Sequence, residues 1–118
     1  MLSLRPLDER VPIQQQLGAT ASPAILINIF TVAPGLLAAW EHDANWMKKQ
    51  PGYISTQLHP GIAGSCMFLN YAVWESVEHF RAAFTNPEFR GALAAYPSSV
   101  VASPHLFEKV AVPNLCAT

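Results

Sequence analysis

The chain has 118 residues, of which 51% are hydrophobic and 13% are charged, and its formal net charge is −1 at pH 7. This length predicts one domain, and the apolar share is too large for a disordered chain, which lacks the apolar area to offset its conformational entropy. A charge near zero, without a cluster of Lys or Arg, argues against nucleic acid as a partner because phosphate binding depends on a basic surface.

The first 23 residues show neither the period of an amphipathic helix nor that of a strand. They carry Pro6 and Pro12 and lack the apolar stretch of a signal peptide. We therefore expect an N-terminal arm over residues 1–23 that is disordered or lies across a partner subunit. A single domain over residues 24–118 follows it.

The cysteines and the apolar runs indicate the cellular compartment. Cys66 and Cys116 match no metal-binding or redox spacing, which is typical of a protein with reduced thiols. The longest apolar run is too short to span a bilayer. We expect a cytoplasmic protein without membrane contact.

The ordered part begins with an apolar run over 24–32 that is rich in β-branched residues. Only Asn28 and Thr31 are polar, which predicts a strand that is buried on both faces. A Pro-Gly pair ends this strand. Apolar side chains at helical spacing then predict a helix over 36–49, which a second Pro-Gly pair terminates.

Side chains of residues 53–59 point alternately to two faces, one of them more apolar than the other, which predicts a half-buried strand. Ile54, Thr56 and Leu58 share one of its faces. A turn over 60–65 separates this strand from the next.

The last third of the chain predicts two helices and two strands. Residues 66–74 form a second strand that is apolar on both faces, interrupted by Asn70. Ser76 is a typical N-cap for the helix that follows, and an Asn-Pro pair begins a shorter helix over 88–95. Residues 105–112 predict the last strand.

The predicted order β-α-β-β-α-β is that of the ferredoxin-like fold, an α+β fold with an antiparallel sheet. In this topology the first and third strands lie side by side in the middle of the sheet, and here they are the two strands that are apolar on both faces. Helices can cover only one face of such a sheet. A second copy of the sheet is the simplest cover for the other face, so we expect a homodimer in which two sheets pack into a barrel.

The polar side chains inside the two apolar strands are candidates for a functional site. A buried amide without partners costs about 1–3 kcal/mol, so Asn28 and Asn70 each need a use. Asn70 and Trp74 share one strand face, and antiparallel pairing would bring Asn28 to the same face. The three side chains would then point into one apolar pocket. The alternative is that each amide is a satisfied buried group or marks a bulge.

Other site chemistry finds no support in the sequence. The four histidines, His42, His59, His79 and His105, form no pair at a metal-binding spacing. The glycines form no nucleotide-binding loop, and no Gly-x-Ser-x-Gly elbow occurs. We therefore expect no metal, flavin, haem or nucleotide cofactor.

Four segments share their residue pattern with one protein family, namely 27–32, 50–59, 68–76 and 104–110. They resemble the antibiotic biosynthesis monooxygenase family, which is part of the dimeric α+β barrel superfamily. The most specific element is the Asn-x-x-x-Trp-Glu-Ser block that begins at Asn70. The resemblance spans residues 24–112 and implies the same fold as the order of elements.

The resemblance also implies an activity. One branch of the family oxidises polycyclic aromatic polyketides, such as anthrones, to quinones with O2 and without metal or flavin. Its proposed active-site residues correspond by position to Asn28, Asn70 and Trp74. The resemblance therefore implies a cofactor-independent monooxygenase that acts on an aromatic small molecule, with the two amides as donors to an oxyanion.

The walls of the pocket should come from apolar and aromatic side chains near these three residues. The candidates for substrate contact are Phe30, Trp40, His59 and Phe80. No strong base is evident in the sequence. His59 and a phenol group of the substrate itself are the alternatives.

Two other functions stay open at this point. A second branch of the family degrades haem and carries a haem-ligating His on the helix after the Trp block. In this chain residues 87–95 contain no His, and His79 comes too early. The third possibility is a barrel that binds a small molecule without catalysis, which a collapsed pocket or backbone-bonded amides would favour.

Overall fold

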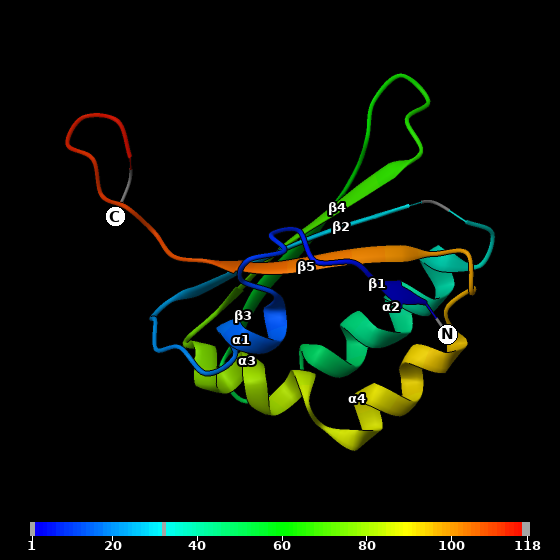
Figure 1. Ribbon diagram of the computed structural model, residues 1–118, viewed down its shortest axis with the longest axis horizontal. Helices are drawn as coiled ribbons and strands as arrows, with labels where there is room; N and C mark the ends of the chain where they lie inside the picture. The colour runs from blue at the N-terminus through cyan, green and yellow to red at the C-terminus, as the bar shows by residue number, and fades with distance from the viewer. Residues whose placement is uncertain (1, 32, 117–118) are drawn as a thin grey trace.

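The computed structural model describes residues 2–31 and 33–116 and consists of a sheet with helices on one face (Figure 1). The strands are β1 (Ser3–Leu4), β2 (Ala24–Thr31), β3 (Tyr53–Pro60), β4 (Met67–Trp74) and β5 (Val101–Phe107). The helices are α1 (Ile13–Gln16), α2 (Leu36–Met47), α3 (Val77–Phe84) and α4 (Pro87–Ala92), with a 3-10 turn over Leu93–Ala95. Val32, which the sequence assigned to the first strand, lies outside the described residues.

The sheet has the strand order β1-β5-β2-β4-β3. β1 pairs in parallel with β5, and every other pair is antiparallel. Without β1, this is the predicted ferredoxin-like order, with the two most apolar strands as neighbours in the middle. The predicted α+β fold is therefore confirmed.

The helix boundaries follow the expected local signals. The Ser76 hydroxyl accepts a hydrogen bond from the backbone N–H of His79 and caps α3, and Asn86 caps α4 in the same way. Gly35 and Gly52, which flank α2, have φ of +87° and +86°, a conformation that L side chains rarely adopt. The Pro34-Gly35 pair thus follows the end of β2, and the Pro51-Gly52 pair follows the end of α2.

Within residues 2–23, β1 joins the chain's own sheet and α1 packs on it, which differs from the predicted disordered or partner-bound arm. Ile13 and Leu17 are buried in the core. The Gln16 side chain accepts from the N–H of Leu106 and donates to its C=O, both at 2.9 Å. A two-residue strand and a four-residue helix are too short to show a period, so the sequence pattern missed them. The division at residue 23 between arm and domain stays a prediction.

The last strand begins earlier and ends earlier than predicted, at Val101 and Phe107 instead of 105 and 112. Pro104 lies inside it, opposite Asn28. β1 pairs with only the first two residues of β5, so β5 is an edge strand at Pro104. A proline lacks the backbone N–H, and at a sheet edge this loss interrupts no hydrogen bonds between strands. Beyond Phe107 the chain has passed the start of β2 and leaves the sheet.

A β-bulge at the start of β3 changes which side chains face the helices. The register with β4 shifts between Tyr53 and Ser55. Ile54 is consequently 52% exposed instead of sharing a face with Thr56 and Leu58. The bulge inserts an extra residue and reverses the alternation that the sequence predicted.

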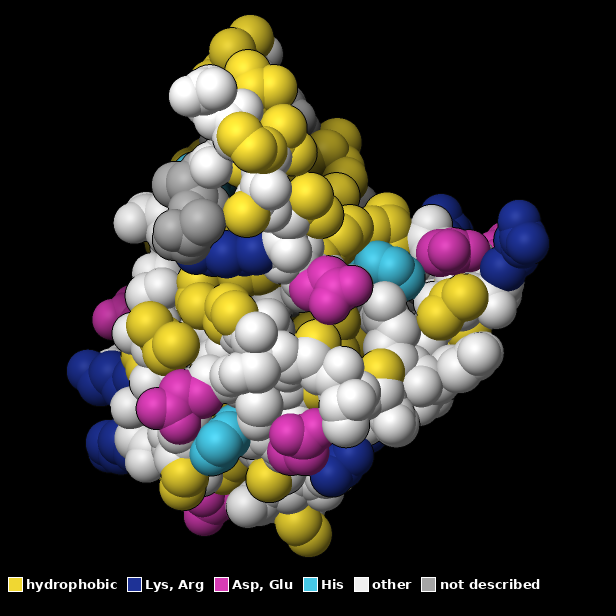
Figure 2. All heavy atoms as spheres, turned by 90° about the vertical axis from the view of Figure 1, so that its left-hand side faces the viewer, with side chains coloured by type: hydrophobic (Ala, Val, Ile, Leu, Met, Phe, Trp, Pro, Cys, Tyr) yellow, Lys and Arg dark blue, Asp and Glu magenta, His cyan; other side chains and the backbone are white. Residues whose placement is uncertain are grey.

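The face of the sheet that points away from the helices is apolar. Side chains alternate along a strand, so this outer face carries the residues between those that face the helices. Its apolar members on the two central strands are Ile25, Ile27, Ile29, Met67, Leu69, Tyr71 and Val73. Tyr71 is 38% exposed and Phe107 of β5 is 44% exposed. Figure 2 shows hydrophobic side chains gathered in the upper part of the molecule, above the helices.

Candidate active site

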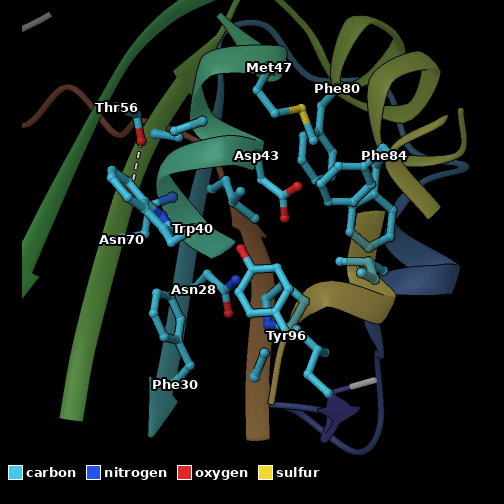
Figure 3. Close-up of a pocket in the computed structure, with 18 of the residues that line it drawn as sticks. Asn28, Phe30, Trp40, Asp43, Met47, Thr56, Asn70, Phe80, Phe84 and Tyr96 are labelled. Carbon is cyan, nitrogen blue, oxygen red and sulfur yellow. Dashed lines mark hydrogen bonds between the residues drawn. The ribbon is translucent and has the colours of Figure 1, made fainter. Parts of the chain in front are cut away.

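A cavity lies between the sheet and the helices, with side chains from every strand and from α2, α3 and α4 in its wall (Figure 3). Its lining is mostly apolar and aromatic and includes Leu26, Phe30, Trp40, Met47, Ala72, Phe80, Phe84 and Leu93. The centres of water-sized molecules can occupy about 100 Å³ of it. A single water needs ~10–15 Å³, so the cavity accepts a larger molecule.

Asn28 and Asn70 lie side by side in the wall of this cavity. They are direct partners in the β2–β4 register, as antiparallel pairing predicted. Residues in this relation have Cβ atoms about 4.5–5.5 Å apart. One polar atom of a bound molecule can therefore reach both amides.

The two amides are not satisfied by the backbone. The Oδ1 atom of Asn28 is buried and has no hydrogen-bond partner. The Oδ1 atom of Asn70 accepts a hydrogen bond of 2.7 Å from the Thr56 hydroxyl on β3 (Figure 3). This contact fixes the orientation of the Asn70 amide. It leaves the amino group of Asn70 free to donate, since no other described residue binds it.

Trp74 is the third predicted member of the site and also lines the cavity. It is 2% exposed. Its ring meets Tyr53 and Phe80 edge to face, with centroid distances of 5.6 and 5.8 Å. These contacts hold the indole in the wall of the same cavity as the two amides.

Three of the four predicted wall residues line the cavity, namely Phe30, Trp40 and Phe80. His59 does not. It is exposed on β3, where its Nδ1 atom lies 3.3 Å from the carbonyl oxygen of Leu69. The neighbouring Thr56 and Leu58 point towards the helices, so alternation turns His59 to the outer face. The prediction that His59 contacts the substrate or acts as its base is therefore not met.

The sequence reasoning missed a buried carboxylate in the cavity wall. Asp43 of α2 is 6% exposed, and its Oδ2 atom has no hydrogen-bond partner. Loss of hydration raises the pKa of this carboxyl above its ordinary value, although Tyr96 and His42 oppose the shift. The sequence does indicate that Asp43 is buried. It follows Trp40 by three residues and precedes Met47 by four, which is the spacing of side chains on the apolar face of a helix.

Replacing Asp43 by Asn should stabilise the fold in a pH-dependent way. A raised pKa means that the folded state binds the proton more tightly than the unfolded state. The contribution of Asp43 to the free energy of unfolding is greatest below about pH 3.9, the ordinary Asp pKa, where the group is protonated in both states. This contribution is lost as the pH rises through the raised pKa of the folded state. We expect Asp43→Asn to exceed the wild type by ~0.5–2 kcal/mol at pH 7 and to match it at acidic pH.

Urea unfolding at a series of pH values measures this difference. Glu41→Gln is the matched control because Glu41 is exposed on the same helix. It should change stability by less than ~0.5 kcal/mol at any pH. An Asp43→Asn variant that is less stable at pH 7 would mean that the carboxylate holds the fold together.

The described part of the chain contains no group of three or more His, Cys, Asp or Glu side chains placed to hold a metal ion. Within the same residues, no helix is long and apolar enough to cross a membrane.

Comparisons with solved structures identify relatives of the same fold. SnoaB, a cofactor-independent oxygenase from Streptomyces nogalater, is 23% identical with a TM-score of 0.71, over 80% of this chain and 99% of that chain. A candidate monooxygenase from Shewanella loihica PV-4 is 34% identical with a TM-score of 0.63, over 80% and 100%. A candidate antibiotic biosynthesis monooxygenase from Deinococcus radiodurans is 14% identical with a TM-score of 0.67, over 80% and 99%.

No curated protein sequence gives a significant match. The family model for antibiotic biosynthesis monooxygenase matches residues 23–95, which is more than half of the chain. This range contains β2 to β4, α2 to α4 and all three of Asn28, Asn70 and Trp74. The chain belongs to the antibiotic biosynthesis monooxygenase family.

Proposed function

We propose that the protein is a cofactor-independent monooxygenase that uses O2 to oxidise a polycyclic aromatic substrate of the anthrone type to a quinone. The observation that carries this proposal is the pair of incompletely satisfied amides, Asn28 and Asn70, in the wall of an apolar cavity. A buried polar atom without a partner indicates a place for a ligand.

The relatives support the same class of reaction. SnoaB is described as a cofactor-independent oxygenase, and its fold matches 80% of this chain. The aromatic lining favours a flat apolar ligand, since Trp40, Phe30 and Phe84 offer edges and faces to its rings. Asn28, Asn70 and Trp74 are the polar groups that would fix its orientation.

The substrate can supply the electrons in this reaction. Loss of a proton from the central ring carbon of an anthrone leaves an electron-rich enolate. The enolate passes one electron to O2, and the two radicals combine to a peroxide. Loss of water then yields the quinone, so that anthrone and O2 give quinone and water. One oxygen atom of O2 enters the product and the other leaves as water.

The protein favours the enolate and excludes water in this scheme. The amino groups of Asn28 and Asn70 donate hydrogen bonds to the developing oxyanion. Such donors act more strongly in a cavity of low dielectric constant and need no reorganisation as the charge forms. We assign to the indole N–H of Trp74 the stabilisation of the peroxide, and the contacts of its ring with Tyr53 and Phe80 support a fixed orientation.

The haem-degrading alternative gains no support from the residues present. No His lines the cavity among the described residues. His79 lies on α3 with its Nδ1 atom 2.7 Å from the Ser76 hydroxyl. It also packs against Gly52, away from the two amides.

Incubation of the purified protein with dithranol, a hydroxylated anthrone, tests the proposed function. We expect quinone absorbance to appear in air at a rate well above the buffer blank and to be absent under argon. A chelator should leave the rate unchanged. Binding of dithranol, seen as quenched tryptophan fluorescence, without any oxidation above the blank would support the non-catalytic barrel instead.

We also propose that the protein is a homodimer in which two copies of the outer sheet face pack together. Ile27 and Ile29 lie on this face and are half-buried in the single chain. The segment 108–116 leaves the sheet beyond β5 and exposes Val110 and Leu115 by 67% and 83%. Exposed apolar surface of this kind marks an interface. The cytoplasmic location stays a prediction from the sequence.

A further inference from the structure

We propose that the Asp43 carboxylate is the general base that removes the proton from the reacting ring carbon of the substrate, with Tyr96 as its positioning residue. This inference rests on the proposed function and names a residue for its first step. The sequence had assigned that step to no residue of the cavity.

The geometry of the cavity supports this role. Asp43 stands on α2, on the helix side of the cavity, whereas Asn28 and Asn70 stand on the sheet side. Figure 3 shows its carboxylate leaving α2 and pointing into the cavity, above Tyr96. A flat substrate bound in this space has the base on one side and the oxyanion donors on the other.

Asp43 is the one carboxylate among the described residues of the lining, and no His, Lys or Arg accompanies it there. The two other titratable groups of the lining are the phenols of Tyr53 and Tyr96. Burial raises the pKa of both phenols above the ordinary value, so they stay protonated at neutral pH. Of these groups, the Asp43 carboxyl has by far the lowest ordinary pKa, which makes it the candidate for accepting a proton.

A purely structural role does not explain the buried charge. The His42 ring lies beside the carboxylate, with its Nδ1 atom 3.7 Å from Oδ1 of Asp43. The His42 side chain is 73% exposed, and an ion pair to an exposed partner contributes little. The Oδ2 atom has no hydrogen-bond partner. An Asn or an apolar residue would fill this position with less desolvation cost.

The proton-transfer step balances without a further reagent. The C–H bond of the ring carbon breaks, its electron pair stays on the substrate as the enolate, and the proton forms an O–H bond on Oδ2 of Asp43. After O2 has added, Asp43 returns this proton to the peroxide and the carboxylate is restored. The second C–H bond of the ring carbon and the O–O bond then break, the carbonyl of the quinone forms, and the second proton and hydroxide leave together as water. Loss of hydration makes the carboxylate a stronger base than an exposed Asp.

Proton exchange in the absence of O2 tests the base separately from the oxidation. The wild type is incubated anaerobically with dithranol in D2O, and the loss of the ring CH2 signal is followed by NMR. We expect exchange well above the buffer rate for the wild type and a loss of about 100-fold or more for Asp43→Asn. Oxidation in air should fall by a similar factor. Glu41→Gln, on the exposed side of α2, should match the wild type.

Two further variants distinguish the base from a structural effect. Asp43→Ala should regain exchange when formate is added, in proportion to the formate concentration, because formate can take the place of the missing carboxylate. Tyr96→Phe should move the acidic limb of the rate profile to higher pH, since the Tyr96 hydroxyl lowers the pKa of Asp43. His42, which also faces the carboxylate, is unchanged in both variants.

The outcomes separate the two proposals. If Asp43→Asn is folded and exchanges protons as fast as the wild type, Asp43 is not the base. The same conclusion follows if the wild type oxidises dithranol but does not speed its proton exchange. If the wild type exchanges protons through Asp43 but forms no quinone in air, the assignment of Asp43 as the base is kept and the proposed oxygenase function is wrong.

Discussion

Asn70→Ala and Trp74→Phe should each lower the turnover of an anthrone by about 100- to 1000-fold, which corresponds to ~2.7–4 kcal/mol of barrier. Each substitution removes a fixed N–H donor from an apolar cavity. Trp74→Phe retains an aromatic ring for the contacts with Tyr53 and Phe80. It therefore separates the effect of the N–H group from that of aromatic packing.

Stability distinguishes this account from a structural role of the same residues. Asn70→Ala leaves the Thr56 hydroxyl without its acceptor, which should cost about 1–3 kcal/mol of folding free energy. If Asn70 only served the fold, activity would follow the folded fraction. Measured kcat and melting temperature on both variants decide between the two. Asn45→Ala, on the exposed side of α2, is the matched control and should keep full turnover.

A folded Asn70→Ala variant with the turnover of the wild type would contradict the assignment of the site. So would a loss of turnover that disappears when the rate is corrected for the folded fraction.

Tyr71→Lys should convert the proposed homodimer to a monomer. Tyr71 lies opposite Ile27 at the centre of the outer sheet face. A buried charge without a partner costs ~3–5 kcal/mol, and twofold symmetry doubles that cost. The dissociation constant should therefore rise by roughly 10⁴-fold or more. Because Tyr71 is 38% exposed in the single chain, the fold itself should tolerate the substitution.

Analytical ultracentrifugation over a range of concentrations measures this change. Leu37→Lys is the control, since Leu37 is 55% exposed on α2 and lies on the helix side of the molecule. It should leave the dimer intact. A wild type that sediments as a 12.9 kDa monomer at micromolar concentration would contradict the proposal.

The sequence predicted the parts of the fold that carry a full hydrophobic period. β2 and β4 are each eight residues long and apolar on both faces, so their central place followed from the pattern. α3 was predictable from its N-cap, Ser76. β1 and α1 were missed because their order depends on contacts with β5, such as those of Gln16 with Leu106, and not on local pattern.

The site was predictable where alternation along a strand decides the direction of a side chain. For that reason the sequence predicted that Asn28 and Asn70 lie on the same face of the sheet. The contact of Thr56 with Asn70 depends on the register of β3, which a bulge shifts, and the sequence does not reveal a bulge. Tyr96 follows the last helical turn, where no periodicity predicts a direction. Asp43 received no role from the sequence, although its spacing places it on the buried face of α2.

The incorporation of oxygen from ¹⁸O2 during dithranol oxidation tests the central claim most directly. The protein is purified without added metal or flavin, treated with a chelator and supplied with ¹⁸O2, and the mass of the quinone is determined. We predict a quinone that carries one ¹⁸O atom, formed by the wild type and not by Asn70→Ala beyond the blank. A quinone whose new oxygen comes from water, or a reaction that requires an added metal or flavin, would contradict a cofactor-independent monooxygenase.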